Sequence, residues 1–279
     1  MMSATNNPPS TTIVAPPVRD AEGLADALLG GTTEERPSTY AGLWTHGEAR
    51  AQEILQLGAS ACGATAVATV LRQLLPDPPL PAAVLAASIC RTRANDAPLP
   101  QYLASRAVAG CTLEECILSV QRASAGRLVG EFERGASFPS AGALLARLAA
   151  LLRSPGVSVI AELNLQLRGN DAWHNQCVYG VDTSARAVFC TNPISEYTAE
   201  EFFALCTTPS VLRVRRADVL CRRDRPGGDE AVLQQPAWRE MRVAEQLAAL
   251  DGSGAAHVVI PAAYEGGIAV IRRAPQGGE

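Results

Sequence analysis

The sequence contains no lysine, so apart from three histidines every basic side chain is an arginine. Without a side-chain amine the chain cannot form a Schiff base, which excludes lysine-based covalent catalysis. Aromatic residues make up only 5%, and no apolar run reaches the roughly 18 residues of a membrane-spanning helix. The net charge of −4 gives no strong attraction to nucleic acid. We therefore expect neither nucleic acid nor a membrane as a partner.

The N-terminus also lacks the basic and apolar segments of a secretory signal, and Arg19 is its first basic residue. The 8 cysteines form no Cys-x-x-Cys pair, which argues against a disulfide scaffold and against a structural zinc site. We expect a cytoplasmic protein with reduced thiols, no metal and no organic cofactor. The sequence does not indicate an oligomeric state.

The chain is long enough for one globular domain with extensions. Residues 1–39 are rich in Pro and Thr, which predicts a disordered tail and linker with room for a short helix at 21–30. Residues 40–279 are expected to form one domain, mainly helical over 40–155 and sheet-forming over 156–279. Helices followed by antiparallel strands indicate an α+β fold.

The sheet half has the β-rich segments and turn residues of antiparallel strands. Strands are expected at 157–165, 174–182, 186–191, 210–221, 257–261 and 267–272. The second and third of these flank a turn at Asp182–Ala185 and should pair as a hairpin, and the last two should form a final hairpin. In the helical half, residues 140–153 form a clear amphipathic helix that stops before Pro155.

A candidate nucleophile lies between Gln56 and Leu75, where a short glycine-containing loop precedes apolar residues at helical spacing. Cys62 falls at the start of this helix, where the positive end of the helix dipole favours a thiolate. Gly63 leaves room beside the sulfur, and Gln56 is spaced to donate a hydrogen bond to an oxyanion alongside the Cys62 backbone N–H. The alternative is a buried cysteine that only fills the core.

A candidate base and its partner lie in the predicted hairpin. His174 begins one strand and Asn192 ends the next, so antiparallel pairing opposes His174 to a position near 194 and places both residues at one end of the sheet. The side-chain oxygen of Asn192 can then accept a hydrogen bond from the imidazole and orient it. A cysteine nucleophile needs this combination of a base and a group that orients the base. Of the other histidines, His46 is expected to be exposed or capping, and His257 is a rival base.

The motif Gln56-x5-Cys62-Gly63 at a helix start resembles the papain-like cysteine peptidases. The later pattern is similar to the C39-like branch of that superfamily: His174-x3-Val178-Tyr179-Gly180-Val181-Asp182, followed by Asn192-Pro193. The resemblance covers residues 50–206. It implies a papain-like fold, in which a helical N-terminal half packs against a C-terminal antiparallel sheet. The chain departs from the pattern at Ala61, where Asp or Trp is frequent, and at Asn192, where Asp is common.

The function expected from these residues is amide hydrolysis through a thioester on Cys62, with a peptide or protein as substrate. Gln56 would stabilise the oxyanion, His174 would act as acid and base, and Asn192 would orient His174. Two alternatives remain open. One is acyl or γ-glutamyl transfer of the phytochelatin-synthase kind on the same scaffold, and the other is a catalytically silent binding module.

Overall fold

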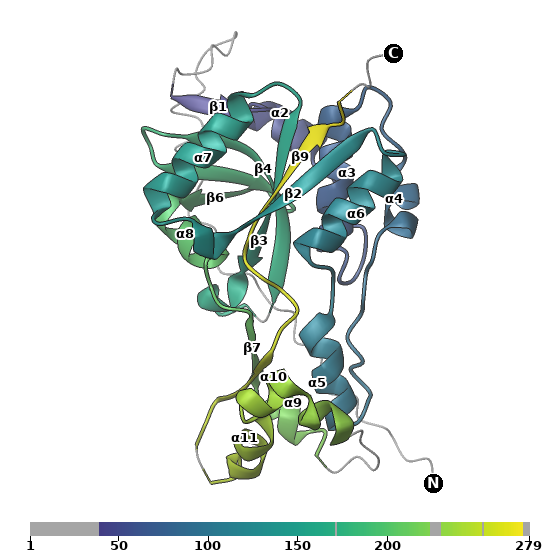
Figure 1. The fold of residues 1–279 in the computed structure, drawn as a ribbon, viewed down its shortest axis with the longest axis vertical. Coiled ribbons are helices and arrows are strands. Elements are labelled where there is room, and N and C mark those ends of the chain that lie inside the picture. Colours follow the sequence, from purple (N-terminus) through teal and green to yellow (C-terminus); the bar gives the residue numbers. More distant parts are fainter. Residues whose placement is uncertain (1–38, 171, 224–229, 253, 276–279) are drawn as a thin grey trace, which may run out of the picture. The chain divides into compact units, whose positions relative to one another are not determined.

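The computed structural model describes residues 39–170, 172–223, 230–252 and 254–275. All of them belong to one compact unit, Arg36–Glu279. Within it, a seven-stranded antiparallel sheet carries helices on both faces, so the predicted α+β class is confirmed (Figure 1). The tail predicted over 1–39, including the helix at 21–30, lies outside the described residues except for Thr39.

The large sheet has the strand order β2-β9-β3-β4-β5-β6, and β1 pairs with the end of β4. Its strands are β1 (Tyr40–Gly42), β2 (Leu128–Arg134), β3 (Val157–Asn164), β4 (Trp173–Asp182), β5 (Ala187–Thr191), β6 (Ser195–Thr198) and β9 (Gly267–Arg273). Both β1 and β2 come from the half of the chain expected to be helical, so the division into a helical half and a sheet half is only approximate. Both halves of the chain contribute strands to the sheet.

The β4–β5 hairpin forms as predicted, and Cys177 pairs with Thr191 in the register that opposes His174 to position 194. The prediction that the last two strands form a hairpin is wrong. β9 inserts between β2 and β3, whereas β8 (His257–Pro261) pairs with β7 (Val211–Arg215) in a separate two-stranded sheet. The apolar run of β9, buried from Gly267 to Ile271, suits a central position in the large sheet.

The remaining elements are mostly helices that cover the two sheets. They are α2 (His46–Gln52), α3 (Cys62–Leu74), α4 (Pro81–Ala87), α5 (Leu99–Val108), α6 (Leu113–Ala123), α7 (Ala141–Arg153), α8 (Ala199–Cys206), α9 (Arg216–Leu220), α10 (Pro236–Glu240) and α11 (Val243–Ala249), with short 3-10 turns at Gly135–Ser137, Leu165–Arg168 and Glu230–Gln234. The strand expected over 210–221 ends at Arg215, where α9 begins.

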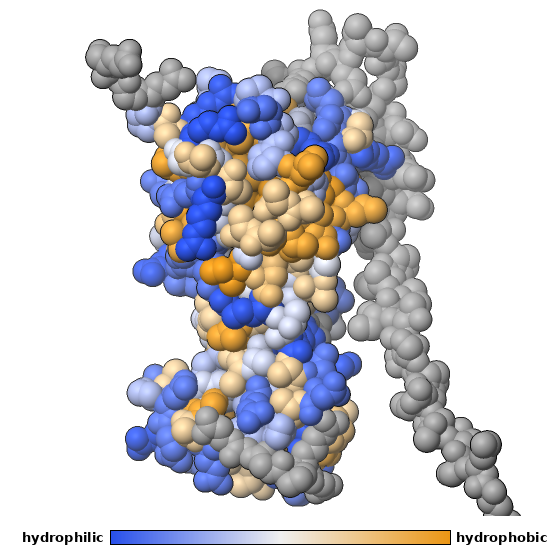
Figure 2. All heavy atoms as spheres, turned by 90° about the vertical axis from the view of Figure 1, so that its right-hand side faces the viewer, coloured by the Kyte–Doolittle hydropathy of each residue, from blue (hydrophilic) through white to orange (hydrophobic). Residues whose placement is uncertain are grey.

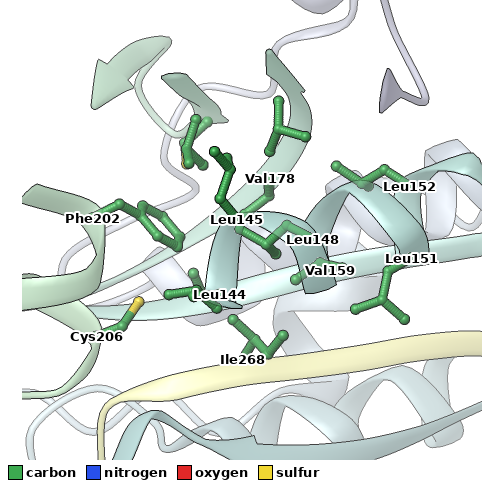
Figure 3. Close-up of a cluster of buried hydrophobic side chains, with 14 of the residues drawn as sticks. Leu144, Leu145, Leu148, Leu151, Leu152, Val159, Val178, Phe202, Cys206 and Ile268 are labelled. Carbon is green, nitrogen blue, oxygen red and sulfur yellow. The ribbon is translucent and has the colours of Figure 1, made fainter. Parts of the chain in front are cut away.

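Every residue of β3 is buried because helices cover both of its faces. Val157, Val159 and Leu163 point into a core with α7 and α8, whereas Ile160 points into a second core with α3 and α6. In the first core, leucines spaced along α7 pack onto the sheet (Figure 3). Burying each of these side chains contributes about 1.5–3 kcal/mol.

A third core joins β7 and β8 to α5, α10 and α11, and it includes Trp173 at the start of β4 and Tyr264 just before β9. These two aromatic residues connect the smaller sheet to the end of the large one.

Apolar residues also gather on the upper part of the face that Figure 2 shows. Leu118 and Val129 are among the exposed large apolar side chains. None of the described helices is long and apolar enough to cross a membrane.

Gly63, in the first turn of α3, lies directly against two cysteines of the neighbouring segment. A Cβ atom at this position would lie 2.0 Å from the Cys111 sulfur and 3.0 Å from the Cys116 sulfur. Both thiols are buried, so neither can swing into solvent. The absence of a side chain at Gly63 is therefore what allows α3 to begin so close to α6.

We expect Gly63→Ala to lower the free energy of unfolding by about 1–3 kcal/mol, because the added methyl overpacks the Cys111 contact. The matched control is Gly142→Ala in α7, where the nearest atom lies 3.8 Å away. At this position, Gly142→Ala should leave the free energy of unfolding unchanged or raise it by up to about 1 kcal/mol. Urea unfolding measures both changes. Equal effects at the two positions would contradict the close contact.

Candidate active site

Cys62 is the first residue of α3, as predicted, and Ala61 is the N-cap. Its side chain is 8% exposed. The backbone N–H groups of Gly63 and Asn175 lower the pKa of its thiol. The sulfur therefore lies at the positive end of a helix, where donors and the helix dipole favour a negative charge.

His174, the second residue of β4, lines the same pocket as Cys62 and interacts with its thiol, so that each group shifts the pKa of the other. Burial raises the pKa of the thiol, but the hydrogen bond and charge of His174, with the two backbone N–H groups, bring it below the ordinary 9.0. Burial lowers the pKa of His174, whereas its contacts with Cys62 and the Asn192 carbonyl raise it above the ordinary 6.5. Both shifts favour a thiolate–imidazolium pair.

Asn192 contacts His174, but through a different atom from the one predicted. The Nε2–H of His174 donates to the backbone carbonyl oxygen of Asn192. The prediction that the side-chain oxygen accepts this bond is therefore wrong. Asn192 has a φ of +69°, so it leaves β5 in the left-handed region rather than as an extended residue. The extended geometry assumed from the sequence does not hold there.

The side chain of Asn192 instead joins α3 to β4. Its Nδ2 donates to the carbonyl oxygens of Cys62 and Asn175 at 3.2 and 3.3 Å. Because the Asn192 carbonyl can only accept, Nε2 of His174 carries a proton, and the other ring nitrogen, Nδ1, is the one available to Cys62. One residue thus orients the imidazole with its backbone and holds the helix start with its side chain.

Gln56 lines the same pocket as Cys62, but its amide is turned into its own loop. The side chain is exposed, and Nε2 donates to the Gly58 carbonyl at 2.9 Å. The loop is attached to α3 by a hydrogen bond from the Leu57 N–H to Thr65 Oγ1 at 3.1 Å. The structure therefore brings Gln56 to the site without directing its amide at an oxyanion position.

The other two histidines lie elsewhere. His46 begins α2, where Thr45 is the N-cap, and its Nδ1 forms a 2.6 Å hydrogen bond with the Tyr179 hydroxyl. His257 is exposed at the start of β8. Neither lines the pocket that contains Cys62, which leaves His174 as the only histidine among that pocket's lining residues.

Cys62 and His174 line a pocket of about 240 Å³. Its lining also includes residues of the third core, namely Leu212 on β7 together with Trp173 and Tyr264. The rings of Trp173 and Tyr264 stack with their centroids 5.5 Å apart. The sulfur therefore faces a small pocket with an aromatic wall, a form typical of ligand sites.

The inner part of the pocket includes two residues that the sequence analysis missed, Glu162 on β3 and Asn175 on β4. The two face each other across the paired strands. Glu162 was detectable as the single charged residue of the apolar run from Val157 to Leu163. That signal marks a buried acid but does not place it beside Cys62.

All eight cysteines are free. Among the described residues, no group of three or more His, Cys, Asp or Glu side chains is arranged to hold a metal ion. No model of a known protein family matches the chain, and no curated protein matches it either.

We expect the rate at which iodoacetamide alkylates Cys62 to rise with pH around a midpoint below 9.0, because only the thiolate reacts. His174→Gln removes the charge that lowers the thiol pKa and leaves the burial that raises it, so the midpoint should move to higher pH. Mass spectrometry of the Cys62 peptide across acidic to alkaline pH measures the rate. A midpoint that His174→Gln leaves unchanged would contradict the contact.

Asn192→Gly separates the two roles of Asn192, because glycine keeps the backbone carbonyl and tolerates the left-handed φ. Loss of Nδ2 leaves two buried carbonyls without this donor, so the free energy of unfolding should fall by about 1–3 kcal/mol. The pH midpoint of Cys62 alkylation should move much less than in His174→Gln, because the carbonyl that orients the imidazole remains. If the midpoint instead shifted as far as it does in His174→Gln, the imidazole would depend on the side chain and not on the carbonyl.

Proposed function

We propose that this chain is a cysteine-dependent hydrolase that cleaves an amide bond of a peptide or protein through a thioester on Cys62. The observation that carries the proposal is the pair of Cys62 and His174, which line one pocket and shift each other's pKa. Both pKa shifts favour the reactive charge state of this pair. Papain-like cysteine peptidases, and the C39-like branch in particular, supply the pattern that the motifs resemble.

In the proposed reaction, the Cys62 thiolate attacks the carbonyl carbon of the amide, and a C–S bond forms. The oxyanion would accept hydrogen bonds from the Cys62 N–H, which lies at the unsatisfied start of α3, and from Gln56 once its amide leaves Gly58. His174 then gives a proton to the departing amine as the C–N bond breaks. Water, deprotonated by His174, hydrolyses the thioester and regenerates the thiol.

The alternatives differ in which observation they require. A binding module needs no reactive thiolate, whereas His174 lowers the pKa of the Cys62 thiol. Transfer to an acceptor would use the same thioester, so product analysis with and without added amines separates it from hydrolysis. The free cysteines suit a reducing compartment, and we therefore propose the cytoplasm as the location.

The test is terminal profiling of a cell-extract proteome incubated with the protein or with Cys62→Ser. We expect new peptide termini with the unchanged protein and a decrease of at least about 10³-fold in their rate of formation with Cys62→Ser. The matched control is Cys221→Ser, which removes an exposed thiol outside the pocket lining and should leave the rate unchanged. Equal cleavage by the protein and by Cys62→Ser would overturn the proposed function.

A further inference from the structure

Glu162 is a buried acid that the proposed reaction does not use. It lies on the central strand β3, is 1% exposed, and lines the pocket that contains Cys62. Its partner in register is Asn175 on β4, which is 2% exposed and lines the same pocket. Two polar side chains therefore lie side by side at the inner end of an otherwise partly aromatic pocket.

Three oxygen atoms of these side chains have no hydrogen-bond partner among the described residues. They are both carboxyl oxygens of Glu162 and Oδ1 of Asn175. The amide orientation of Asn175 is determined, because its Nδ2 donates at 3.1 Å to the Cys111 carbonyl, which can only accept. Buried polar atoms are rarely left without a partner, so a ligand that donates hydrogen bonds would complete this set.

The positive groups of the pocket are already engaged. Arg93 and Arg106 line it, and each has an interaction partner within the chain. His174 donates to the Asn192 carbonyl and interacts with Cys62. Neither carboxyl oxygen of Glu162 accepts a hydrogen bond from these groups, although Nε of Arg106 is also buried without a hydrogen-bond partner among the described residues.

The surroundings of Glu162 favour the neutral form of its carboxyl. Burial raises the pKa of its carboxyl well above the ordinary 4.5, and electrostatic interaction with Cys111, Cys62 and Glu114 raises it further. The Leu113 N–H offsets a small part of this rise but lies outside hydrogen-bond geometry. Glu162 in turn contributes to the raised pKa of three other groups, Cys116 on α6, Cys206 on α8 and Tyr264.

We propose that Glu162 and Asn175 form a subsite for a primary ammonium, amidinium or guanidinium group, so that the Cys62 site acts on amides with a positive charge near the cleaved bond. This inference rests on the proposed function, since it names the substrate class of the same site. The stacked rings of Trp173 and Tyr264 add an aromatic wall, which also favours a cation.

Binding of the cation would be coupled to the release of a proton from Glu162. When the cation enters, the O–H bond of the Glu162 carboxyl breaks, the proton passes to the buffer, and the carboxylate accepts hydrogen bonds from the cation together with Asn175 Oδ1. The carboxyl thus becomes charged only when a counter-charge is present, which avoids the cost of an unpaired buried charge.

The test is calorimetric titration of the full chain with benzamidine, and with benzamide and benzoate as neutral and anionic probes of the same shape. We expect benzamidine to bind at least about 10-fold more tightly than either, as a charge-assisted hydrogen bond implies. Its binding should release protons at neutral pH, seen as heats that differ between buffers of different ionisation enthalpy. Both measurements use the unchanged protein and do not depend on the folding of a variant.

Glu162→Gln should abolish the preference for benzamidine and the proton release. The matched control is Glu114→Gln, which removes a nearby exposed charge outside the pocket lining and should keep both. Equal binding of benzamidine and benzamide, tighter binding of benzoate, or benzamidine binding that Glu162→Gln leaves unchanged would overturn the subsite. The last result would mean that benzamidine binds at a place that does not involve the Glu162 carboxyl.

The two proposals fail in different ways. If benzamidine does not bind but Cys62 forms the reactive thiolate and cleaves peptides, only the subsite is wrong. If benzamidine binds through Glu162 but Cys62→Ser cleaves as fast as the unchanged protein, the hydrolase is wrong and the cation subsite stands.

Discussion

The geometry of the candidate site depends on two hydrogen bonds that the Asn192 side chain donates to the Cys62 and Asn175 carbonyls. Cys62 lies on a helix and His174 on a strand, so their contact depends on how the start of that helix is placed against the sheet. Displacements of about 1 Å are enough to impair catalysis. A single buried amide that bonds both elements fixes the start of α3 on the end of the sheet.

Burial acts against charge on both members of the pair. It raises the pKa of the Cys62 thiol and lowers that of the His174 imidazole, so each side chain alone would be neutral. Only their mutual contact reverses the two shifts. The charged state is therefore a property of the contact, and it is the alignment of helix and strand that determines whether the sulfur is nucleophilic.

The sequence predicted the elements that carry local signals. Cys62 begins a helix, the β4–β5 hairpin has the expected register, and α7 ends before Pro155. Long-range pairing was less accessible, because nothing local directs β9 to β2 and β3 rather than to β8. At the site, the sequence identified Cys62, His174 and Asn192 but not which atoms of Asn192 act. The left-handed φ of Asn192 and the burial of Glu162 both depend on tertiary structure.

The hydrogen bond from Gln56 to the Gly58 carbonyl belongs to the conformation of the loop without substrate. Under the proposed mechanism, the amide exchanges this carbonyl for the substrate oxyanion, and because one hydrogen bond replaces another, the exchange is nearly balanced in free energy. Alkylating reagents form no tetrahedral oxyanion, so they report on the thiolate alone. Chemical reactivity and turnover at the same sulfur can thus be uncoupled, and an inhibitor that mimics a tetrahedral centre would be the ligand that turns this amide.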